Sequence, residues 1–487
     1  MAITIKEILN KLGYSVDYIN EAYQHIIENL EWYQNNVKKF HQYKVYNGLS
    51  VVTEKMLRLG MAKKVCEDWA TLLLNEKVSI KAGEYDDTLK AILERNNFDE
   101  QGNQLVEIAF ALGTGAFVEY YNNKKEIDID YIRADMIYPL SWNNGVITEC
   151  AFGSEKIING RKCIYLQIHR FGNIEYKENN KFYYIENAYF DKENGKELSP
   201  LNNVQSVVAT KSKIPLFQII KPNIINNIDL DSPLGISIYA NAFDQLKACD
   251  SIYDSYINEF ILGKKRILVP ISLAKKRMQA DGVEAPVFDP NDTVFYALPG
   301  DRNSEMKPES IDMTIRAQEH ELGIQRALDL LSLKCGMGTG RYKFDSSGVK
   351  TATEVISDKS DLYQNLKKNE KIIKSAIIGL VKAIAFLDGK KNVKVTVDFD
   401  DSIIEDSNTT IDRNIKLTQA GLRSKKTAIM EINKCSEQEA EKELEKIHED
   451  GQITGQDIDW TKGDDDDREN QIENVDDVED EDNEPTE

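Results

Sequence analysis

Two helical segments separated by a proline-rich insert constrain this chain more than any other feature. Asp231-Ser232-Pro233 is a helix-start signal, a polar cap followed by proline, and apolar residues at helical spacing continue from it to a stop at Gly263. A second helix is expected from about Asp312 to Lys334. Residues 264–311 contain five prolines, which exclude a long helix there. The simplest geometry is two helices side by side with a small module at one end.

The region before these helices is expected to be α+β. Residues 1–80 are predicted to be mostly helical, with one helix starting near Thr53, and Glu84 to Leu112 forms one or two more. The apolar period then changes to about two, which is typical of strands. The expected strands cover 117–121, 127–131, 146–152, 163–171 and 181–185. Residues 1–230 should therefore contain an antiparallel sheet.

After the second helix, a glycine-rich break and a polar loop are expected up to Val349. Thr351-Ala352-Thr353-Glu354 is a capping box, which predicts the start of a very long helix that ends at Asp388-Gly389. The remaining expected elements are a strand at 393–399, helices at about 409–420 and 425–433, and a helix begun by a capping box at 436–439. The C-terminal part of the chain is thus predicted to be mainly helical.

Charge is distributed unevenly along the chain. The net charge is −21, and Asp464 to Glu487 contributes 14 acids against one base, so the remainder carries −8. A chain whose residues before Asp464 carry a net negative charge is not a general nucleic-acid binder, because tight binding to phosphates requires many Lys and Arg. Highly charged segments with few apolar residues cannot form a core, so we expect disorder past about Asp464.

Familiar catalytic and metal-binding patterns are not found. The six cysteines form no C-x-x-C pair, the five histidines are far apart, and the glycines of 336–340 lack P-loop spacing. No signal peptide or membrane span is expected, which favours an intracellular, reduced setting. Asp398, Asp400 and Asp401 follow a strand, where a metal-dependent nuclease could hold a divalent ion, but no second carboxylate cluster supports that alternative. We therefore expect no enzyme activity, catalytic residue, metal or cofactor.

Three segments carry a resemblance to a known family. The first is Asn47–Val78, with its Leu59–Lys63 run and Asp68–Glu76 segment, and the second is Gly348–Val355 followed by Ser357 and Ser360. The third is Ala420–Thr427, which departs from the family pattern at Lys426, where Glu is frequent. In this order they resemble phage portal proteins, in the branch found in siphophages of Gram-positive hosts.

The resemblance implies a portal fold with a wing, a helical stem, a clip and a crown, assembled as a ring of commonly twelve subunits around a central channel. The implied divisions are 1–230 (wing), 231–263 and 312–335 (stem helices), 264–311 (clip), 336–350 (tunnel loop), 351–400 (long wing helix and strand), 401–450 (helical crown) and 451–487 (acidic tail).

It also implies a role at the unique capsid vertex, as a conduit for DNA packaging and ejection. The implied partners are other copies of the chain, double-stranded DNA, the terminase large subunit, scaffolding and major capsid proteins, and a head-completion or adaptor protein, with no membrane. The chain would occupy the virion, and the host cytoplasm during assembly. A non-viral helical scaffold or adaptor that binds only proteins is the other class of function considered.

A physical argument accompanies the channel role. DNA slides most easily past a wall that holds its phosphates weakly, and an acidic wall has this property. The lumen-facing candidates on the first stem helix are Asp244, Asp250, Asp254 and Glu259. The expected tunnel loop contains three bases, Arg341, Lys343 and Lys350. Two interpretations of them stay open: transient contact with the DNA backbone, or solubility of the loop alone. Strands of the 264–311 insert are expected to exchange between neighbouring subunits, because that would satisfy open strand edges.

Overall fold

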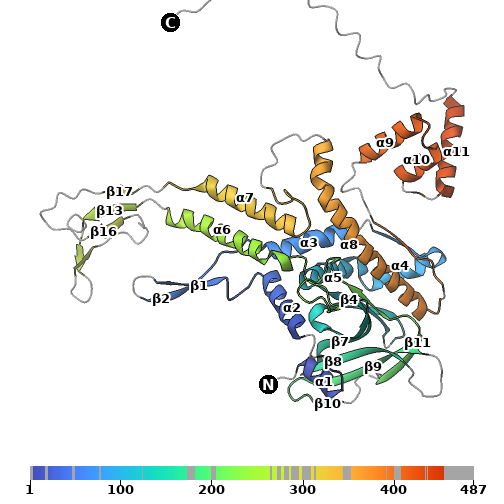
Figure 1. Cartoon of the computed structure of the whole chain (residues 1–487), viewed down its shortest axis with the longest axis horizontal. Helices are drawn as coiled ribbons and strands as arrows, with labels where there is room; N and C mark the ends of the chain where they lie inside the picture. The colour runs from blue at the N-terminus through green and yellow to red at the C-terminus, as the bar shows by residue number, and fades with distance from the viewer. Residues whose placement is uncertain are drawn as a thin grey trace, which may run out of the picture. The chain divides into compact units, whose positions relative to one another are not determined.

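The computed structural model forms two compact units, residues 1–400 and 401–487, and each is described separately (Figure 1). The structure describes residues 4–16, 20–46, 50–75, 78–122, 124–158, 160–172, 181–198, 205–263, 266–270, 276–278, 284–286, 295–298, 309–311, 314–343, 352–390, 392–399, 407–433, 435 and 437–454.

Two antiparallel sheets form the β portion of the first unit. The larger has the order β10-β9-β8-β7-β6, with β11 also paired to β9, and the smaller has the order β12-β4-β5. Their strands are β4 (Gly115–Tyr121), β5 (Ile127–Arg133), β6 (Ile137–Asn143), β7 (Val146–Ile158), β8 (Arg161–Gly172), β9 (Phe182–Asp191), β10 (Glu197–Leu198), β11 (Val207–Ser212) and β12 (Phe217–Ile220). All five strands expected from the sequence are confirmed, with extended bounds, and so is the α+β antiparallel architecture.

A short N-terminal helix covers one face of the larger sheet. Helix α1 (Ile5–Lys11) starts with a capping box, in which the Glu7 amide donates to the Thr4 hydroxyl and the Thr4 amide donates to the Glu7 carboxylate. Ile8 and Leu9 of this helix are fully buried against a cluster that includes Leu166 and Ile168 of β8. Burial of these apolar side chains fixes the helix on the sheet.

Four helices precede β4 after α1 in this unit: α2 (Asn20–Tyr33), α3 (Met61–Leu73), α4 (Asp86–Arg95) and α5 (Phe98–Leu112). Trp69 of α3 packs against Phe110 of α5, and both side chains are fully buried. α5 ends at Gly113, whose φ of +94° favours glycine. An added Cβ there would lie 2.6 Å from the carbonyl oxygen of Gly235, so the two backbones cross in close contact.

The expected helix start near Thr53 is wrong. The structure has a hairpin of β1 (Gln42–Tyr46) and β2 (Val51–Lys55), and α3 begins only at Met61. The Met56 amide donates to the His41 carbonyl and closes the base of the hairpin. β-branched residues at Val51, Val52 and Thr53 favour the strand, and the helical spacing seen in the sequence belongs to α3 alone.

The start of the first stem helix is also corrected. Residues 231–239 are not helical, and helix α6 (Phe243–Leu262) follows a short 3-10 turn, η4 (Ala240–Ala242). Tertiary contacts override the local signal, because the Gly235 amide donates to Thr114 and the Ile238 amide donates to the carbonyl of Phe110. The second stem helix, α7 (Ala317–Lys334), begins five residues after the expected start at Asp312.

The described parts of the insert between α6 and α7 are strands, as the sequence predicts. β13 (Arg266–Pro270) pairs with β16 (Phe295–Leu298) in parallel and with β17 (Glu309–Ile311) antiparallel. A separate pair is formed by β14 (Lys276–Met278) and β15 (Glu284–Pro286). The insert is therefore a small β module between two helices.

The long helix after the polar loop is confirmed as α8 (Ala352–Leu387), 36 residues that end just before Gly389 with φ +77°. In the C-terminal half of this helix, the side chains of Ile373, Ile377, Leu380 and Ile384 are buried. The expected strand at 393–399 is shorter, β18 (Thr396–Asp398), and it pairs with β3 (Ser79–Lys81). Residues far apart in sequence thus complete one small sheet.

The second unit contains α9 (Ser407–Gln419), α10 (Lys425–Ile432) and α11 (Glu437–Thr454), which confirms the three expected C-terminal helices. Ion pairs join them: Glu431 accepts from Arg413 and Arg423, and Lys426 contacts Glu437 and Glu441 at 2.9 Å each. The expected disorder past Asp464 concerns residues outside those that the structure describes.

Candidate functional site

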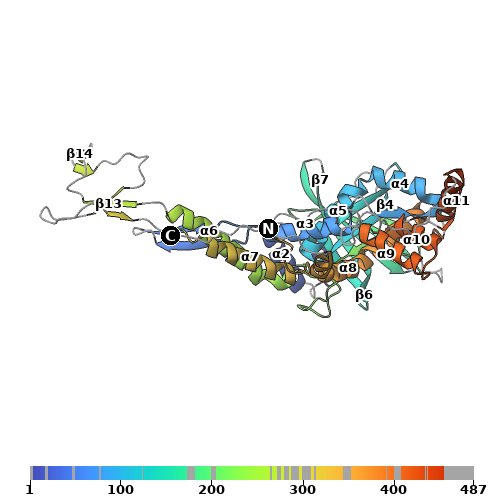
Figure 2. The same ribbon diagram turned by 90° about the horizontal axis from the view of Figure 1, so that it is seen from above.

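The helix pair α6–α7 is the candidate site, because the expected stem acids lie on α6 and two of the expected loop bases, Arg341 and Lys343, follow α7 closely in the chain. The two helices lie side by side in Figures 1 and 2, and they run antiparallel. Arg316 at the start of α7 donates from Nε and Nη2 to the two carboxylate oxygens of Glu259 near the end of α6, at 3.0 and 2.8 Å. Hydrogen bonds from this guanidinium lower the pKa of Glu259 to about 2.

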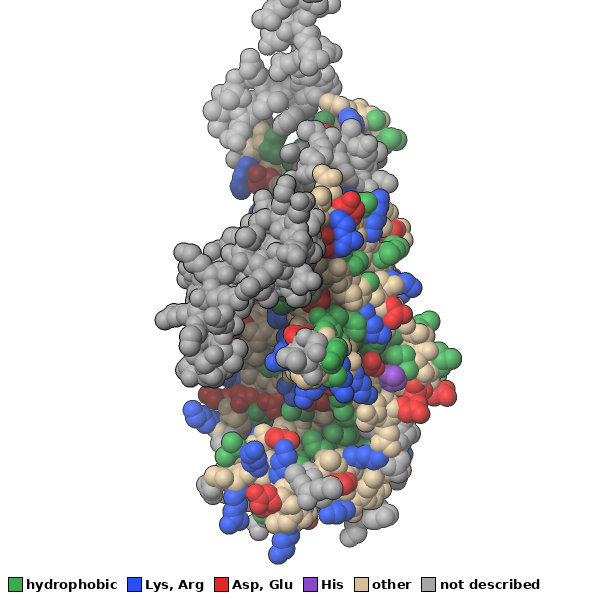
Figure 3. All heavy atoms as spheres, turned by 90° about the vertical axis from the view of Figure 1, so that its left-hand side faces the viewer, with side chains coloured by type: hydrophobic (Ala, Val, Ile, Leu, Met, Phe, Trp, Pro, Cys, Tyr) green, Lys and Arg blue, Asp and Glu red, His purple; other side chains and the backbone are tan. Residues whose placement is uncertain are grey.

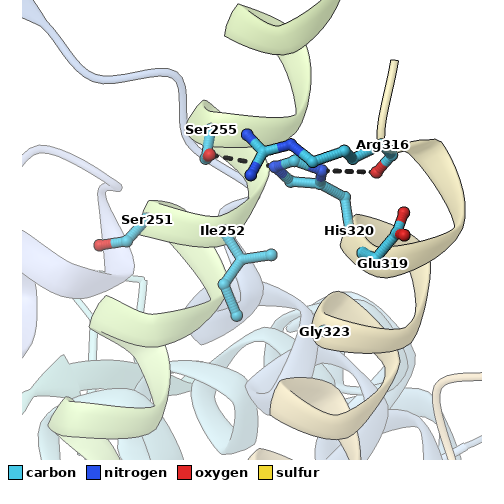
Figure 4. A pocket seen from close by; sticks show the side chains of 7 residues that line it. All are labelled: Ser251, Ile252, Ser255, Arg316, Glu319, His320 and Gly323. Carbon is cyan, nitrogen blue, oxygen red and sulfur yellow. Dashed lines mark hydrogen bonds between the residues drawn. The ribbon is translucent and has the colours of Figure 1, made fainter. Parts of the chain in front are cut away.

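A pocket of about 400 Å³ opens between the two helices (Figure 4). Its lining consists of Ser251, Ile252, Ser255, Arg316, Glu319, His320 and Gly323. His320 Nδ1 lies 2.7 Å from the Arg316 carbonyl oxygen, which only accepts, so Nδ1 carries the proton and Nε2 accepts from the Ser255 hydroxyl at 3.1 Å. The polar groups of the pocket therefore join α6 to α7.

Two of the four stem acids are buried inside the chain. Asp250 is 3% exposed and Asp254 is 8% exposed. Asp250 accepts hydrogen bonds from the amides of Leu59 and Gly60 at 2.8 and 3.4 Å, and Asp254 accepts from the amide of Leu57 at 2.7 Å. These carboxylates hold the segment between the β1–β2 hairpin and α3.

His41 completes this anchor. The Val37 amide donates to its Nδ1 at 3.0 Å, so Nε2 carries the proton and donates to Asp250 at 3.0 Å. Both side chains are buried, at 3% and 5% exposure. The base of the hairpin is thus tied to the middle of α6 by a hydrogen-bonded network in which the side chains of His41, Asp250 and Asp254 are buried.

Some of the four acids are expected to line a channel. Asp250 and Asp254 are buried and hydrogen-bonded within the chain, and such carboxylates present little charge to a lumen. Glu259 is neutralised by Arg316. Asp244 is 88% exposed, with Lys247 Nζ 3.2 Å away. A lumen-facing role stays a prediction for Asp244 and Glu259.

The described start of the expected tunnel loop is anchored on three helices. Trp69 Nε1 of α3 donates to the Cys335 carbonyl at 3.1 Å, and Asn365 of α8 donates to the Gly336 carbonyl at 3.0 Å. Gln325 of α7 donates to the Tyr342 carbonyl at 3.0 Å. Burial and the nearby Asp68 carboxylate raise the pKa of Tyr342. Residues 335–342 consequently form an ordered base for the loop.

The three loop bases have different surroundings. Arg341 Nε lies 3.6 Å from Oδ2 of Asp68. Oδ1 of the same carboxylate lies 2.9 Å from Lys64 Nζ. Lys343 is exposed and lines an open pocket of about 430 Å³ together with Arg326 and Asp329. Lys350 lies outside the described residues. Contact of these bases with DNA stays a prediction.

Sequence reasoning missed Arg316, His41 and Asp68. Arg316 lies in the stretch assigned to helix, and the other two resemble ordinary polar residues when only the sequence is considered. Only folding brings each residue to its partner. Arg316 is 57 positions from Glu259, His41 is 209 positions from Asp250, and Asp68 is 273 positions from Arg341.

The nuclease alternative finds no support in the described chain. Asp398 ends β18, whereas Asp400 and Asp401 lie outside the described residues. Within the described ranges, three or more His, Cys, Asp or Glu side chains do not gather in a way that could hold a metal ion. Among those same residues, each helix is too short or too polar to cross a membrane.

Comparison with protein families gives a match over residues 14–456 to the family described as "Phage portal protein, SPP1 Gp6-like". The chain belongs to this family. The match covers most of the chain, including the wing, stem, clip and crown segments assigned by resemblance. The phage portal family is structural rather than enzymatic, which agrees with the expectation that the chain is not an enzyme.

Comparison with solved structures finds a chain from the "Neck of native GTA particle computed with C12 symmetry", at a TM-score of 0.38 and 12% identity. The similarity covers 76% of this portal-family chain and 88% of that chain. No curated protein matches the chain.

Proposed function

We propose that this chain is the portal subunit of a phage of Gram-positive hosts, from the branch found in siphophages. Copies of it, twelve in the assembled capsid, form a ring at one vertex, and double-stranded DNA passes through the central channel during packaging and ejection. The observation that carries this proposal is the portal-family match over residues 14–456. The antiparallel α6–α7 pair with a β module between its helices supports it.

Within the ring, we assign the stem to helices α6 and α7, which lie within 231–263 and 312–335, the clip to 264–311, the tunnel loop to 336–350 and the crown to 401–450. The remaining parts, 1–230 and 351–400, form the wing. The clip would dock the terminase large subunit and later the head-completion protein. Scaffolding and major capsid proteins would surround the ring during assembly in the host cytoplasm and in the virion.

Electron microscopy of the purified, full-length chain tests the ring. The expected images are annular particles with a central hole when viewed along the symmetry axis. A chain that stays monomeric at all protein and salt concentrations, or that forms particles without a hole, would contradict the proposal and favour a helical scaffold or adaptor.

The loop bases are tested by packaging. Lys343→Ala is expected to alter the length or the retention of packaged DNA, because Lys343 is exposed at the base of the loop. Arg341→Ala should have the smaller effect, since Asp68 already neutralises Arg341. Unchanged packaging and retention in both variants would remove the DNA-contact role and leave loop solubility as their function.

A further inference from the structure

The β1–β2 hairpin (Gln42–Tyr46 and Val51–Lys55) exposes apolar side chains on both of its faces. Tyr46 and Val51 are cross-strand partners and are 67% and 63% exposed, and Tyr43 and Val45 are 37% and 39% exposed. Within the described chain, the two strands have their extensive contacts with each other and not with a third strand. A two-stranded hairpin is marginal in water without a further strand or a packed face.

The hairpin is nevertheless held firmly at its base. His41 precedes β1 and donates to Asp250, and the amides of Leu57 and Leu59 beyond β2 donate to Asp254 and Asp250. The side chains of His41, Asp250 and Asp254 are all buried. A rigid base with a projecting apolar end is an arrangement suited to contact with a partner.

The same segment is basic on an acidic molecule. Residues 38–58 contain five bases, Lys38, Lys39, Lys44, Lys55 and Arg58, against one acid, Glu54, which is a net charge of +4. The chain as a whole carries −21, so the remainder carries −25. In Figure 3, which faces the projecting end of the hairpin, basic and hydrophobic side chains surround it. A second copy of the chain is thus an electrostatically complementary partner.

A matching surface lies on α7. Leu322, Leu330 and Leu333 are 61%, 55% and 48% exposed, at spacings that place them along one side of the helix. Exposed Glu319 and Glu321 lie beside Leu322, and Arg326, whose side chain is 75% exposed, lies between Leu322 and Leu330 on the same side. In Figure 1, α6 runs between α7 on one flank and the hairpin on the other. The hairpin and α7 of one chain are therefore separated by α6.

We propose that the hairpin of one copy docks on the Leu322–Leu330–Leu333 stripe of α7 in the next copy, with Lys44 and Lys55 toward the acidic residues of that helix. The inference rests on the ring of the proposed function and names a surface that closes it. A ring of identical subunits requires two different, complementary patches on each copy, and the hairpin and α7 lie on opposite flanks of α6.

Mixed cysteine cross-linking tests this contact. One population of chains carries Val51→Cys and another carries Leu330→Cys, both with Cys435→Ser because the other five cysteines are buried. The two populations are co-assembled and treated with a short bismaleimide. We expect a covalent dimer only in the mixture. The control population carries Ile157→Cys, a position that is 75% exposed on β7, and should give no dimer with Leu330→Cys.

The outcomes separate the two proposals. Rings that form normally, with no hairpin-to-α7 dimer from Val51→Cys with Leu330→Cys or from Tyr46→Cys with Leu322→Cys, overturn the docking proposal and keep the portal ring. The same result would point to a capsid protein as the partner of the hairpin. Failure of the unmodified chain to form rings overturns both proposals. Tyr46→Lys with Val51→Lys should also reduce the ring fraction, whereas Ile157→Lys should not.

Discussion

At the scale of single residues, burial decides what the acids of α6 do. Asp244 and Asp250 lie on the same helix, yet one is exposed beside Lys247 and the other accepts bonds from His41 and two amides. Removing an acceptor from a buried network leaves its donors unsatisfied, which costs about 1–3 kcal/mol for each donor. The structural role of Asp250 is therefore measurable apart from any assembly role.

Asp250→Ala is expected to lower the free energy of unfolding by roughly 3 kcal/mol, because the His41 ring and the amides of Leu59 and Gly60 lose their acceptor. Hydrogen exchange at Leu59 and Gly60 should become faster. Asp244→Ala on the same helix is the control and should stay within about 0.5 kcal/mol of the unmodified chain. Equal effects of the two substitutions would contradict the anchor.

Glu119 in β4 is fully buried, and neither carboxylate oxygen bonds to another residue. Burial raises its pKa well above the ordinary value of 4.5, so the fold favours the protonated carboxyl more than the unfolded chain does. Its contribution to stability is complete below pH 4.5 and is lost as the pH rises toward the folded-state pKa.

Glu119→Gln removes this ionisation. The gain in unfolding free energy over the unmodified chain should therefore grow between pH 5 and pH 8, measured by urea denaturation of the two proteins at each pH. Glu84→Gln is the matched control at an exposed glutamate and should show no such growth. A difference that stays flat or shrinks as the pH rises would mean that folding does not raise the pKa of Glu119.

At the scale of elements, the approach to α6 depends on the crossing of two glycines. An added Cβ at Gly113 would meet the Gly235 carbonyl at 2.6 Å, and one at Gly235 would meet the Gly113 carbonyl at 2.3 Å. Backbone atoms have little room to move away from such contacts. The close approach also lets residues 234–239 bond to the end of α5, which is why no helix forms at Pro233.

Gly113→Ala should destabilise the chain by several kcal/mol, since it combines left-handed strain with a backbone clash. Gly145→Ala is the control, because Gly145 has a φ of +73° and an added Cβ meets nothing within 4 Å. That variant should cost about 1–2 kcal/mol from strain alone. Thermal unfolding of both variants measures the difference, and similar losses would show that the crossing has room for a methyl group.

At the scale of the whole molecule, assembly should change the insert between α6 and α7. β13 has neighbours on both sides, whereas β16 and β17 each lie at an edge of their three-stranded sheet. Open edges are completed by strands of other chains when copies come together. Strand exchange around the ring follows from this reasoning together with the proposed function.

Hydrogen exchange on dissociated subunits and on rings checks this expectation. Amides of β16 (Phe295–Leu298) and β17 (Glu309–Ile311) should gain protection in the ring, because edge amides there acquire partners. Amides of β8, which lies inside the larger sheet, serve as the internal control and should not change. Equal protection of β16 and β17 before and after assembly would rule out strand exchange.

The periodic and capping signals of the sequence predicted α2, α4, α5, α8 and the three C-terminal helices, as well as the strands β4, β5, β7, β8 and β9. These elements follow from local patterns of apolar residues, caps and glycine stops, which the chain carries whatever its tertiary contacts. Family resemblance then led from the order of the elements to a portal protein, and the family match agrees with it.

Tertiary structure alone decided the β1–β2 hairpin, the delayed start of α6 and the burial of Asp250 and Asp254. Each depends on partners distant in sequence, such as His41 with Asp250 or Thr114 with Gly235, and these contacts outweigh a local helix signal worth about 1 kcal/mol. The charge of an acid is visible in the sequence, but its exposure is set by what packs against it.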